Sequence, residues 1–293
     1  MAQTILLTGA GGQLGRELSR CAPTDIDCVA LGRQQLDLTS PAQIAEVLDR
    51  VAPDQVINAA AYTAVDAAET DASAAWAANS DGPRQLAREC TERGIRLLQV
   101  STDFVFDGES ARPYAPQDLP SPLGEYGRSK LAGEQAVRDE CADSLVLRTG
   151  WVYSRFGGNF VKTMLRLMAD REELSVVTDQ VGTPTWAHGL AEALWAAIGK
   201  PELQGTYHWS DAGVCSWYDF AMAIYEEARA IDLLASPVSI RPINASDYPT
   251  PARRPAFSVL DKTLSWRDLE LEPVHWRQQL RAMLNELLEQ QDA

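Results

Sequence analysis

A tyrosine and a lysine four residues apart, Tyr126 and Lys130, could act as a proton donor and the cation that tunes it. Residues at i and i+4 lie on one face of a helix, so the ammonium can approach the phenol. A free phenol has a pKa of about 10, and a nearby positive charge lowers that pKa. The pair predicts an acid/base unit, although a lone Tyr-x-x-x-Lys is more often ordinary amphipathic helix.

A glycine motif far upstream indicates where a phosphate-bearing ligand would bind. Gly9, Gly12 and Gly15 form a G-x-x-G-x-x-G pattern directly after a short apolar segment. This spacing permits a tight strand-to-helix turn and lets a pyrophosphate approach the free N–H groups of the helix N-terminus. A plain turn rarely needs three glycines, so we predict a dinucleotide site that also includes Gln13 and Leu14.

The residues after the second predicted strand favour NADPH as the cofactor. An acidic residue there would bind both ribose hydroxyls and favour NAD, but the chain has Gly32-Arg33-Gln34-Gln35. The guanidinium of Arg33 matches the geometry of a 2′-phosphate, so NADPH is expected, with NADH as the alternative. We expect Asp37 and Leu38 beneath the adenine. The cofactor's phosphates or ribose should meet a run of four residues, Ala60, Ala61, Tyr62 and Thr63.

Polar side chains also follow the fourth predicted strand, at Ser101-Thr102-Asp103. Open α/β sheets bind ligands at the carboxyl ends of their strands. The Thr102 hydroxyl could therefore bond a substrate carbonyl beside Tyr126. It could equally do no more than cap the turn, and the local sequence leaves both alternatives open.

Apolar segments that alternate with amphipathic ones predict a doubly wound, parallel α/β sheet of the Rossmann type. The predicted strands cover residues 4–8, 28–31, 55–61, 96–101 and 144–148. The predicted helices begin near Gln13 and cover 41–51, 72–79, 83–93 and 126–141. Residues 1–150 should therefore form a dinucleotide-binding domain, to which later segments return.

Beyond Trp151 the alternation loosens, which predicts a smaller C-terminal lobe for substrate over most of residues 151–293. Its expected elements are helices at 159–171, 186–198 and 275–290 and a strand at 174–177. Residues 237–255 are rich in proline, asparagine and serine, which favours a loop that covers a ligand.

Composition narrows the class of protein. The net charge of −15 and the pI near 4.6 argue against nucleic acid as a partner. The five scattered cysteines contain no C-x-x-C pair, which favours a reducing compartment. We find no secretory signal and no apolar stretch long enough to cross a bilayer, so we expect a cytoplasmic protein with no membrane partner.

Several longer motifs resemble those of extended short-chain dehydrogenases/reductases, and within them the branch that reduces dTDP-linked 4-keto sugars. The similar segments are residues 13–15, 58–66, 101–106, 126–130, 148–153, 159–164 and 249–255. The resemblance implies reduction of the C4 ketone of a dTDP-6-deoxy-L-hexulose, giving dTDP-L-rhamnose for polysaccharide synthesis.

The resemblance also implies roles for individual residues. Tyr126 would donate a proton to the developing alkoxide, and Lys130 would bind the nicotinamide ribose and lower the pKa of Tyr126. Thr102 would polarise the ketone, with Asp103 alongside. The expected contacts with the rest of the dTDP-sugar are Trp151 and Asn159, and Arg253 and Arg254 at the diphosphate.

Some relatives form dimers through magnesium held by surface glutamates. Glu17 and Glu286 are the candidate ligands here, but His188 stands at a third expected carboxylate position. Imidazole fits Mg²⁺ poorly, which argues against this metal even if the chain forms a homodimer.

Two alternatives belong to other classes of function. One is a non-catalytic NADP-binding regulatory subunit, against which the presence of Thr102, Tyr126 and Lys130 argues. The other is a nucleotide-sugar epimerase or dehydratase. A dehydratase would be expected to have Asp-Glu after the threonine, whereas Thr102 is followed by Asp103-Phe104.

Overall fold

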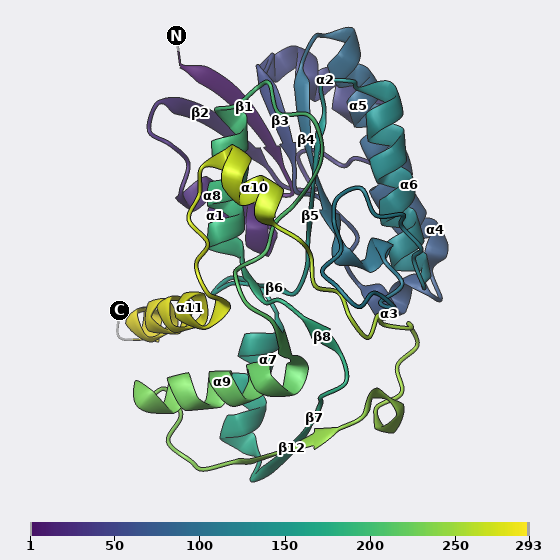
Figure 1. Cartoon of the computed structure of the whole chain (residues 1–293). Coiled ribbons are helices and arrows are strands. Elements are labelled where there is room, and N and C mark those ends of the chain that lie inside the picture. Colours follow the sequence, from purple (N-terminus) through teal and green to yellow (C-terminus); the bar gives the residue numbers. More distant parts are fainter. Residues whose placement is uncertain (1, 292–293) are drawn as a thin grey trace.

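A six-stranded parallel sheet forms the larger of two lobes in the computed structural model, which describes residues 2–291 (Figure 1). The strand order is β10-β5-β4-β3-β1-β2, and every neighbouring pair is parallel. The strands are β1 (Gln3–Thr8), β2 (Ile26–Leu31), β3 (Gln55–Asn58), β4 (Arg96–Thr102), β5 (Leu145–Thr149) and β10 (Gly205–His208). The predicted doubly wound parallel sheet is confirmed, and its first five strands match the predicted segments.

Helices cover both faces of this sheet (Figure 1). One face holds α1 (Gln13–Arg20) and α8 (Ala187–Ile198); the other holds α2 (Pro41–Val51), α5 (Gly82–Glu92) and α6 (Glu125–Glu140). Strand β1 is apolar at successive positions because both of its faces are buried. Ile5 and Leu7 pack with α8 and Leu6 packs with α2, because successive side chains point to opposite faces.

The chain between β3 and β4 differs from the prediction of two separate helices. It forms one nearly continuous run of α4 (Ala72–Trp76), a π-helical turn (Ala77–Asp81) and α5, preceded by the short α3 (Val65–Ala68). Pro83 lacks an N–H group and sits in the first turn of α5, where that group has no intrahelical partner. The intervening π turn places Asn79 against α6, as π turns often do near functional sites.

The smaller lobe is built around α7 (Phe160–Asp170), α9 (Trp217–Ala230) and α11 (Trp276–Gln291). Strand β7 (Glu173–Val177) pairs in parallel with β12 (Ser239–Ile243), so part of the segment expected to be a loop is a strand. The two strands lie more than sixty residues apart in the chain, so the local sequence around β12 does not show that it pairs with β7. Helix α9 was also missed. The remaining short elements are β6 (Val152–Tyr153), β8 (Val181–Gly182), β9 (Thr185–Trp186), β11 (Cys215–Ser216), the 3₁₀ turns Asp103–Val105 and Ala245–Asp247, and α10 (Thr263–Leu269).

Three segments beyond residue 150 lie on the larger lobe. Strand β10 pairs with β5, α8 contacts α1, and α10 contacts both β10 and α8. The division of the chain at residue 150 stays a prediction. None of the helices in residues 2–291 is both long and apolar enough to cross a membrane.

Candidate active site

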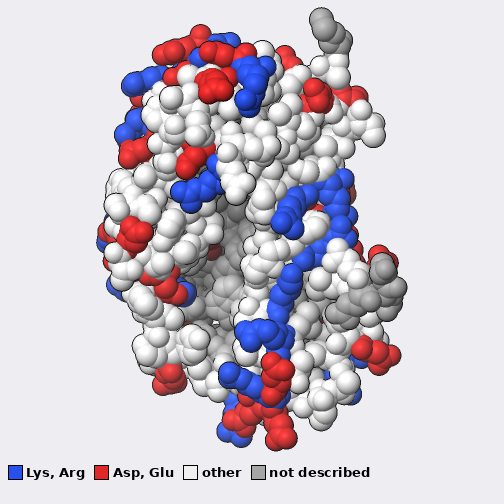
Figure 2. All heavy atoms as spheres, turned by 180° about the vertical axis from the view of Figure 1, so that it is seen from behind, with Lys and Arg blue, Asp and Glu red and all other residues white. Residues whose placement is uncertain are grey.

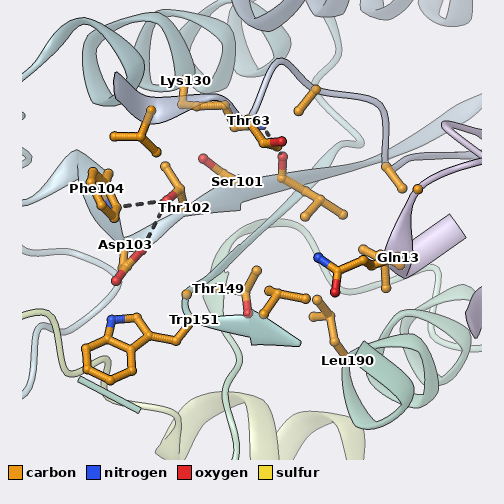
Figure 3. A pocket seen from close by; sticks show the side chains of 18 of the residues that line it. Gln13, Thr63, Ser101, Thr102, Asp103, Phe104, Lys130, Thr149, Trp151 and Leu190 are labelled. Atoms are coloured by element: carbon orange, nitrogen blue, oxygen red, sulfur yellow. Dashed lines mark hydrogen bonds between the residues drawn. The ribbon is translucent and has the colours of Figure 1, made fainter. Parts of the chain in front are cut away.

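A cavity of about 440 Å³ opens at the carboxyl ends of β1, β3, β4 and β5. Figure 3 shows Lys130 from α6, Thr102 at the end of β4, Asp103 directly after it, and Gln13 from α1 around the cavity. This first cavity brings together twelve of the predicted site residues: Gly12, Gln13, Leu14, Gly15, Ala61, Thr63, Thr102, Asp103, Tyr126, Lys130, Trp151 and Asn159. Residues up to 147 positions apart in the sequence therefore line one cavity.

Tyr126 and Lys130 occupy the first turns of α6, and both side chains are almost fully buried. The Lys130 Nζ donates a hydrogen bond to the Val100 carbonyl at 2.8 Å. Burial lowers the pKa of Lys130 to about 8. Burial also raises the pKa of Tyr126 to about 12, against a smaller lowering by the Thr102 hydroxyl.

Burial therefore keeps the pKa of Tyr126 above that of a free phenol, and the expected lowering of this pKa by Lys130 stays a prediction. Loss of hydration is the largest cause of the rise, because a phenolate in a buried site loses its contact with water. The consequence is a phenol that keeps its proton throughout the neutral range.

The start of α6 is held by a chain of hydrogen bonds. The Ser129 hydroxyl donates to the Tyr126 carbonyl at 2.8 Å and accepts from Asn79 Nδ2 at 3.1 Å. The Asn79 side chain also donates to the Tyr62 carbonyl and accepts from the Tyr62 amide. Gly133 permits this approach, since a Cβ there would lie 1.9 Å from the Asn79 carbonyl oxygen. The hydrogen bonds from Asn79 of the π turn to Ser129, and from Ser129 to Tyr126, thus fix the position of Tyr126 at the start of α6.

Thr102 caps the 3₁₀ turn after β4 and also lines the first cavity. Its hydroxyl accepts from the Phe104 amide at 3.2 Å and donates to Asp103 Oδ1 at 3.1 Å. Burial raises the pKa of Asp103 to about 6, although hydroxyls of Ser258 and Thr102 oppose this rise. The capping role is present, and a contact between Thr102 and a substrate carbonyl stays a prediction.

The glycine turn is shaped by close backbone approach. Gly9 has a φ of +71°, and a Cβ on it would lie 2.7 Å from the Ala60 amide nitrogen. A Cβ on Gly15 would lie 2.2 Å from the Gly9 carbonyl oxygen. Gly12 is the N-cap residue of α1. As a glycine it has no side chain that could accept a hydrogen bond from the first N–H groups of the helix. The cradle fits a pyrophosphate, because those N–H groups stay available to an anion.

A second cavity of about 710 Å³ adjoins the glycine turn and collects the other predicted cofactor residues. These are Gly9, Arg33, Asp37, Leu38, Ala60 and Tyr62. The Arg33 side chain is 84% exposed, and its Nε lies 3.5 Å from Asp37 Oδ2. An exposed guanidinium with a single weak ion pair is free to reach a phosphate.

A third cavity of about 670 Å³ lies in the smaller lobe and contains Arg254. Arg254 donates two hydrogen bonds to the Asp66 carboxylate, at 3.0 and 2.8 Å, and so joins the loop before α10 to α3. Arg253 is exposed and lines none of the three cavities. The structure thus separates two arginines that the sequence places side by side.

The chain is similar to known proteins over nearly its whole length. Residues 3–289 match a family model described as the RmlD substrate binding domain. A dTDP-4-dehydrorhamnose reductase of Burkholderia thailandensis is 42% identical over 98% of this chain and 99% of its own length. The chain belongs to the dTDP-4-dehydrorhamnose reductase family.

Two further relatives of this family bear on its chemistry. A crystal structure of the Bacillus anthracis dTDP-4-dehydrorhamnose reductase in complex with NADP superposes with a TM-score of 0.92. It is 35% identical, and the match covers 98% of this chain and all of that one. A protein of Streptomyces antibioticus named as a probable dTDP-4,6-dihydroxy-2-methyloxan-3-one 4-ketoreductase is 42% identical over 97% of this chain and 95% of its own length.

The residues considered for magnesium in this family member do not fit the metal. Glu17 is fully buried and accepts from Ser154, and its carboxylate forms an ion pair with Arg20 at 2.7 Å. Glu286 contacts the same guanidinium at 3.2 Å, and His188 Nδ1 lies 3.1 Å from it. Within residues 2–291 no group of three or more potential ligand side chains could hold a metal ion. Arg20 thus pairs with both carboxylates, and Arg155 also lies 3.6 Å from Glu286.

Cations flank the cavities despite the acidic composition. The face seen in Figure 2 is hollowed near its centre, and lysine and arginine side chains follow one rim. The guanidiniums of Arg16 and Arg155 both lie over the Phe156 ring, and Lys162 Nζ donates to the Arg155 carbonyl. These cations flank Asn159 of the first cavity, so an anionic ligand meets a locally favourable field.

Sequence reasoning missed several residues of the site. Thr149, the last residue of β5, and Gly150 after it line the first cavity, and Trp217 lines the third. Thr149 lies at a strand end, which is a general signal for a ligand-contacting residue. Nothing in the local sequence singles out Trp217, because the ring on which it stacks, Trp151, lies 66 positions earlier.

Proposed function

We propose that this protein reduces the C4 ketone of dTDP-4-dehydro-6-deoxy-L-mannose, with NADPH as reductant, to give dTDP-L-rhamnose. The observation that carries the proposal is the meeting of Tyr126, Lys130 and Thr102 in one cavity beside the glycine cradle. Membership of the dTDP-4-dehydrorhamnose reductase family supports the choice of substrate.

Three residues that line the first cavity can each carry out one part of the reduction. Tyr126 holds a proton that it donates to the oxygen of the reduced ketone, and its high pKa keeps that proton available at neutral pH. The Lys130 ammonium lies on the same face of α6 and stabilises the phenolate that forms. Thr102 would orient the carbonyl by turning its hydroxyl proton from Asp103 Oδ1 to the ketone oxygen.

NADPH, when bound, supplies the hydride to the ketone carbon. The α1 N-terminus and its glycines would hold the pyrophosphate, and Arg33 would hold the 2′-phosphate. Trp151, Asn159 and Arg254 would contact the sugar nucleotide, with Arg254 exchanging Asp66 for the diphosphate. Arg253 is the weaker candidate for contact with the diphosphate, because its side chain is exposed and lines none of the three cavities.

The direct test supplies purified protein with dTDP-4-dehydro-L-rhamnose and either NADPH or NADH, and follows loss of absorbance at the nicotinamide band. Turnover with formation of dTDP-L-rhamnose supports the proposal. NADPH binding without turnover of any keto sugar would instead favour a regulatory subunit.

A second candidate function is reduction of a different dTDP-linked 4-keto sugar. The Streptomyces antibioticus relative favours it, because that protein is equally similar in sequence and is named for another ketone. Competition between the two dTDP-keto sugars, scored as the ratio of their kcat/KM values, separates the two functions. A homodimer and a cytoplasmic location stay predictions, which light scattering and fractionation can measure.

The rate of reduction should fall as pH rises through about 8. The pKa of Lys130 is lowered to about 8, so its positive charge is lost above that pH, and with it the stabilisation of the Tyr126 phenolate. A profile of kcat/KM against pH at constant ionic strength measures this limb. Lys130→Arg keeps the charge and should move the limb to higher pH; an unchanged limb would assign it to another group.

Arg33→Ala should weaken NADPH binding about tenfold, since one charge-assisted hydrogen bond at an exposed site contributes about that much. NADH lacks the 2′-phosphate, so its Kd should stay nearly constant. Calorimetric titration of both cofactors measures the difference. Arg50→Ala, which removes another exposed arginine, is the matched control. An equal loss for both cofactors would remove Arg33 from cofactor selection.

A further inference from the structure

Two tryptophans from distant parts of the chain form a stacked pair between the first and third cavities. The ring centroids of Trp151 and Trp217 lie 3.5 Å apart with an interplanar angle of 3°. Trp151 lines the first cavity together with Thr102 and Tyr126, and Trp217 lines the third together with Arg254. The pair is therefore a shared wall of the two cavities.

The backbone of Trp151 is held independently of its ring. Its φ is +52°, a region that large side chains seldom occupy and that costs about 1–3 kcal/mol. The Trp151 and Gly150 carbonyls both accept hydrogen bonds from Thr185, at 3.1 and 2.6 Å. These bonds fix the main chain after β5, but they leave the direction of the indole to other contacts. In Figure 3 that indole lies below Asp103, at the edge of the first cavity.

Close contacts with α9 and β8 fix the plane of the Trp151 ring. Trp217 stacks against one face. On the backbone of β8, a Cβ at Gly182 would lie 2.5 Å from Trp151 Cε2, so only glycine leaves room for the ring. Trp217 is thus the one large aromatic side chain in the described structure with its ring stacked on Trp151.

Trp217 has a rigid anchor of its own. It is the first residue of α9, directly after the N-cap Ser216. Ser216 and Asp219 form a complete capping box, in which the Asp219 amide donates to Ser216 Oγ at 3.0 Å. Phe160 packs on Trp217 with centroids 4.6 Å apart. The position of Trp217 is therefore set by α7 and α9, and Trp151 takes its orientation from it.

We propose that Trp217 is a positioning residue of this enzyme, which fixes the Trp151 indole so that the sugar end of the substrate stays aligned with Thr102 and Tyr126. The inference rests on the proposed function. A ligand with its ketone at Tyr126 and its anionic part near Arg254 has to pass this wall. The orientation of Trp151 then governs where the sugar lies.

Kinetics of four variants test the inference: Trp217→Leu, Trp151→Leu, the double variant, and Gly182→Ala, whose added methyl group would displace the Trp151 ring. Trp217→Leu should lower kcat/KM for the dTDP-keto sugar about tenfold, the upper range of what an aromatic pair contributes. The Kd for NADPH should not change. The double variant should be no worse than Trp151→Leu alone, because both substitutions remove the same interaction.

Circular dichroism reports the stack without any substrate. Two stacked indoles give an exciton couplet when their transition dipoles are rotated within the stack, and this couplet should be lost in both single leucine variants. Trp266→Phe, on α10, is the matched control and should keep both the couplet and the activity. If wild-type protein reduces no dTDP-keto sugar, the proposed function fails before any variant is compared.

Two results would overturn the positioning role. The first is a Trp217→Leu variant that keeps its kcat/KM. The second is a double variant in which the two single effects multiply, since independent contributions mean that Trp217 does not act through Trp151.

Discussion

Tyr126→Phe should lower kcat by a factor of about 10² to 10⁴, the usual contribution of a general acid. Phenylalanine keeps the ring and its edge-to-face packing on Phe104, at 5.6 Å between centroids, but has no proton to give. The NADPH Kd should change little, because the cofactor is expected to be held mainly by the glycine turn and the second cavity. Steady-state kinetics and calorimetric titration on the same preparation measure both quantities.

Tyr207→Phe is the matched control for the loss of a phenol. Tyr207 lies in β10, away from the first cavity, and its hydroxyl donates to Asp268 at 3.1 Å. Its kcat should equal that of the wild type. If Tyr126→Phe also kept full activity, another group would have to supply the proton, and the assignment of Tyr126 would be wrong.

Glu134→Ala should lower the free energy of unfolding by about 3–5 kcal/mol, the cost of leaving a buried charge without its partner. Arg148 is 2% exposed and Glu134 1%, and two guanidinium nitrogens of Arg148 reach the carboxylate at 2.9 and 2.7 Å. Glu134 also accepts from the Ser101 hydroxyl at 2.5 Å, next to Thr102. Urea denaturation followed by circular dichroism measures the loss.

Two variants separate this effect from simple loss of a charged residue. Glu46→Ala removes the carboxylate of an exposed i,i+4 pair with Arg50 and should cost at most about 0.5 kcal/mol. The double variant Glu134→Leu/Arg148→Met leaves no buried charge and should recover much of the lost stability. A Glu134→Ala loss no larger than that of Glu46→Ala would mean that water reaches Arg148.

The larger lobe could be predicted because its signals are local. A strand buried on both faces is continuously apolar, as at Ile5, Leu6 and Leu7, and helices follow with a period of 3.6 residues. The glycine spacing after β1 is also a local signal, and Gly15 meets the Gly9 carbonyl only six residues earlier; the Ala60 backbone that Gly9 meets lies 51 residues away.

The elements that were missed depend on partners far along the chain. Strand β12 exists through its pairing with β7, and β10 through its pairing with β5. Four or five residues bury too little surface to specify a strand by pattern alone. The rise in the pKa of Tyr126 could not be predicted for a related reason: the spacing to Lys130 is visible in the sequence, but the desolvation of both groups is not.

The sequence by itself determined the types of chemistry available here: a phenol and an amine at helical spacing, a glycine turn for phosphate, and hydroxyls at a strand end. These follow from residue identity and short-range geometry. Only the tertiary structure decided that Arg254 binds Asp66 while Arg253 faces solvent, and that Trp217 holds Trp151. Those outcomes depend on which distant surfaces pack together, because burial and ion pairing are set by neighbours in space.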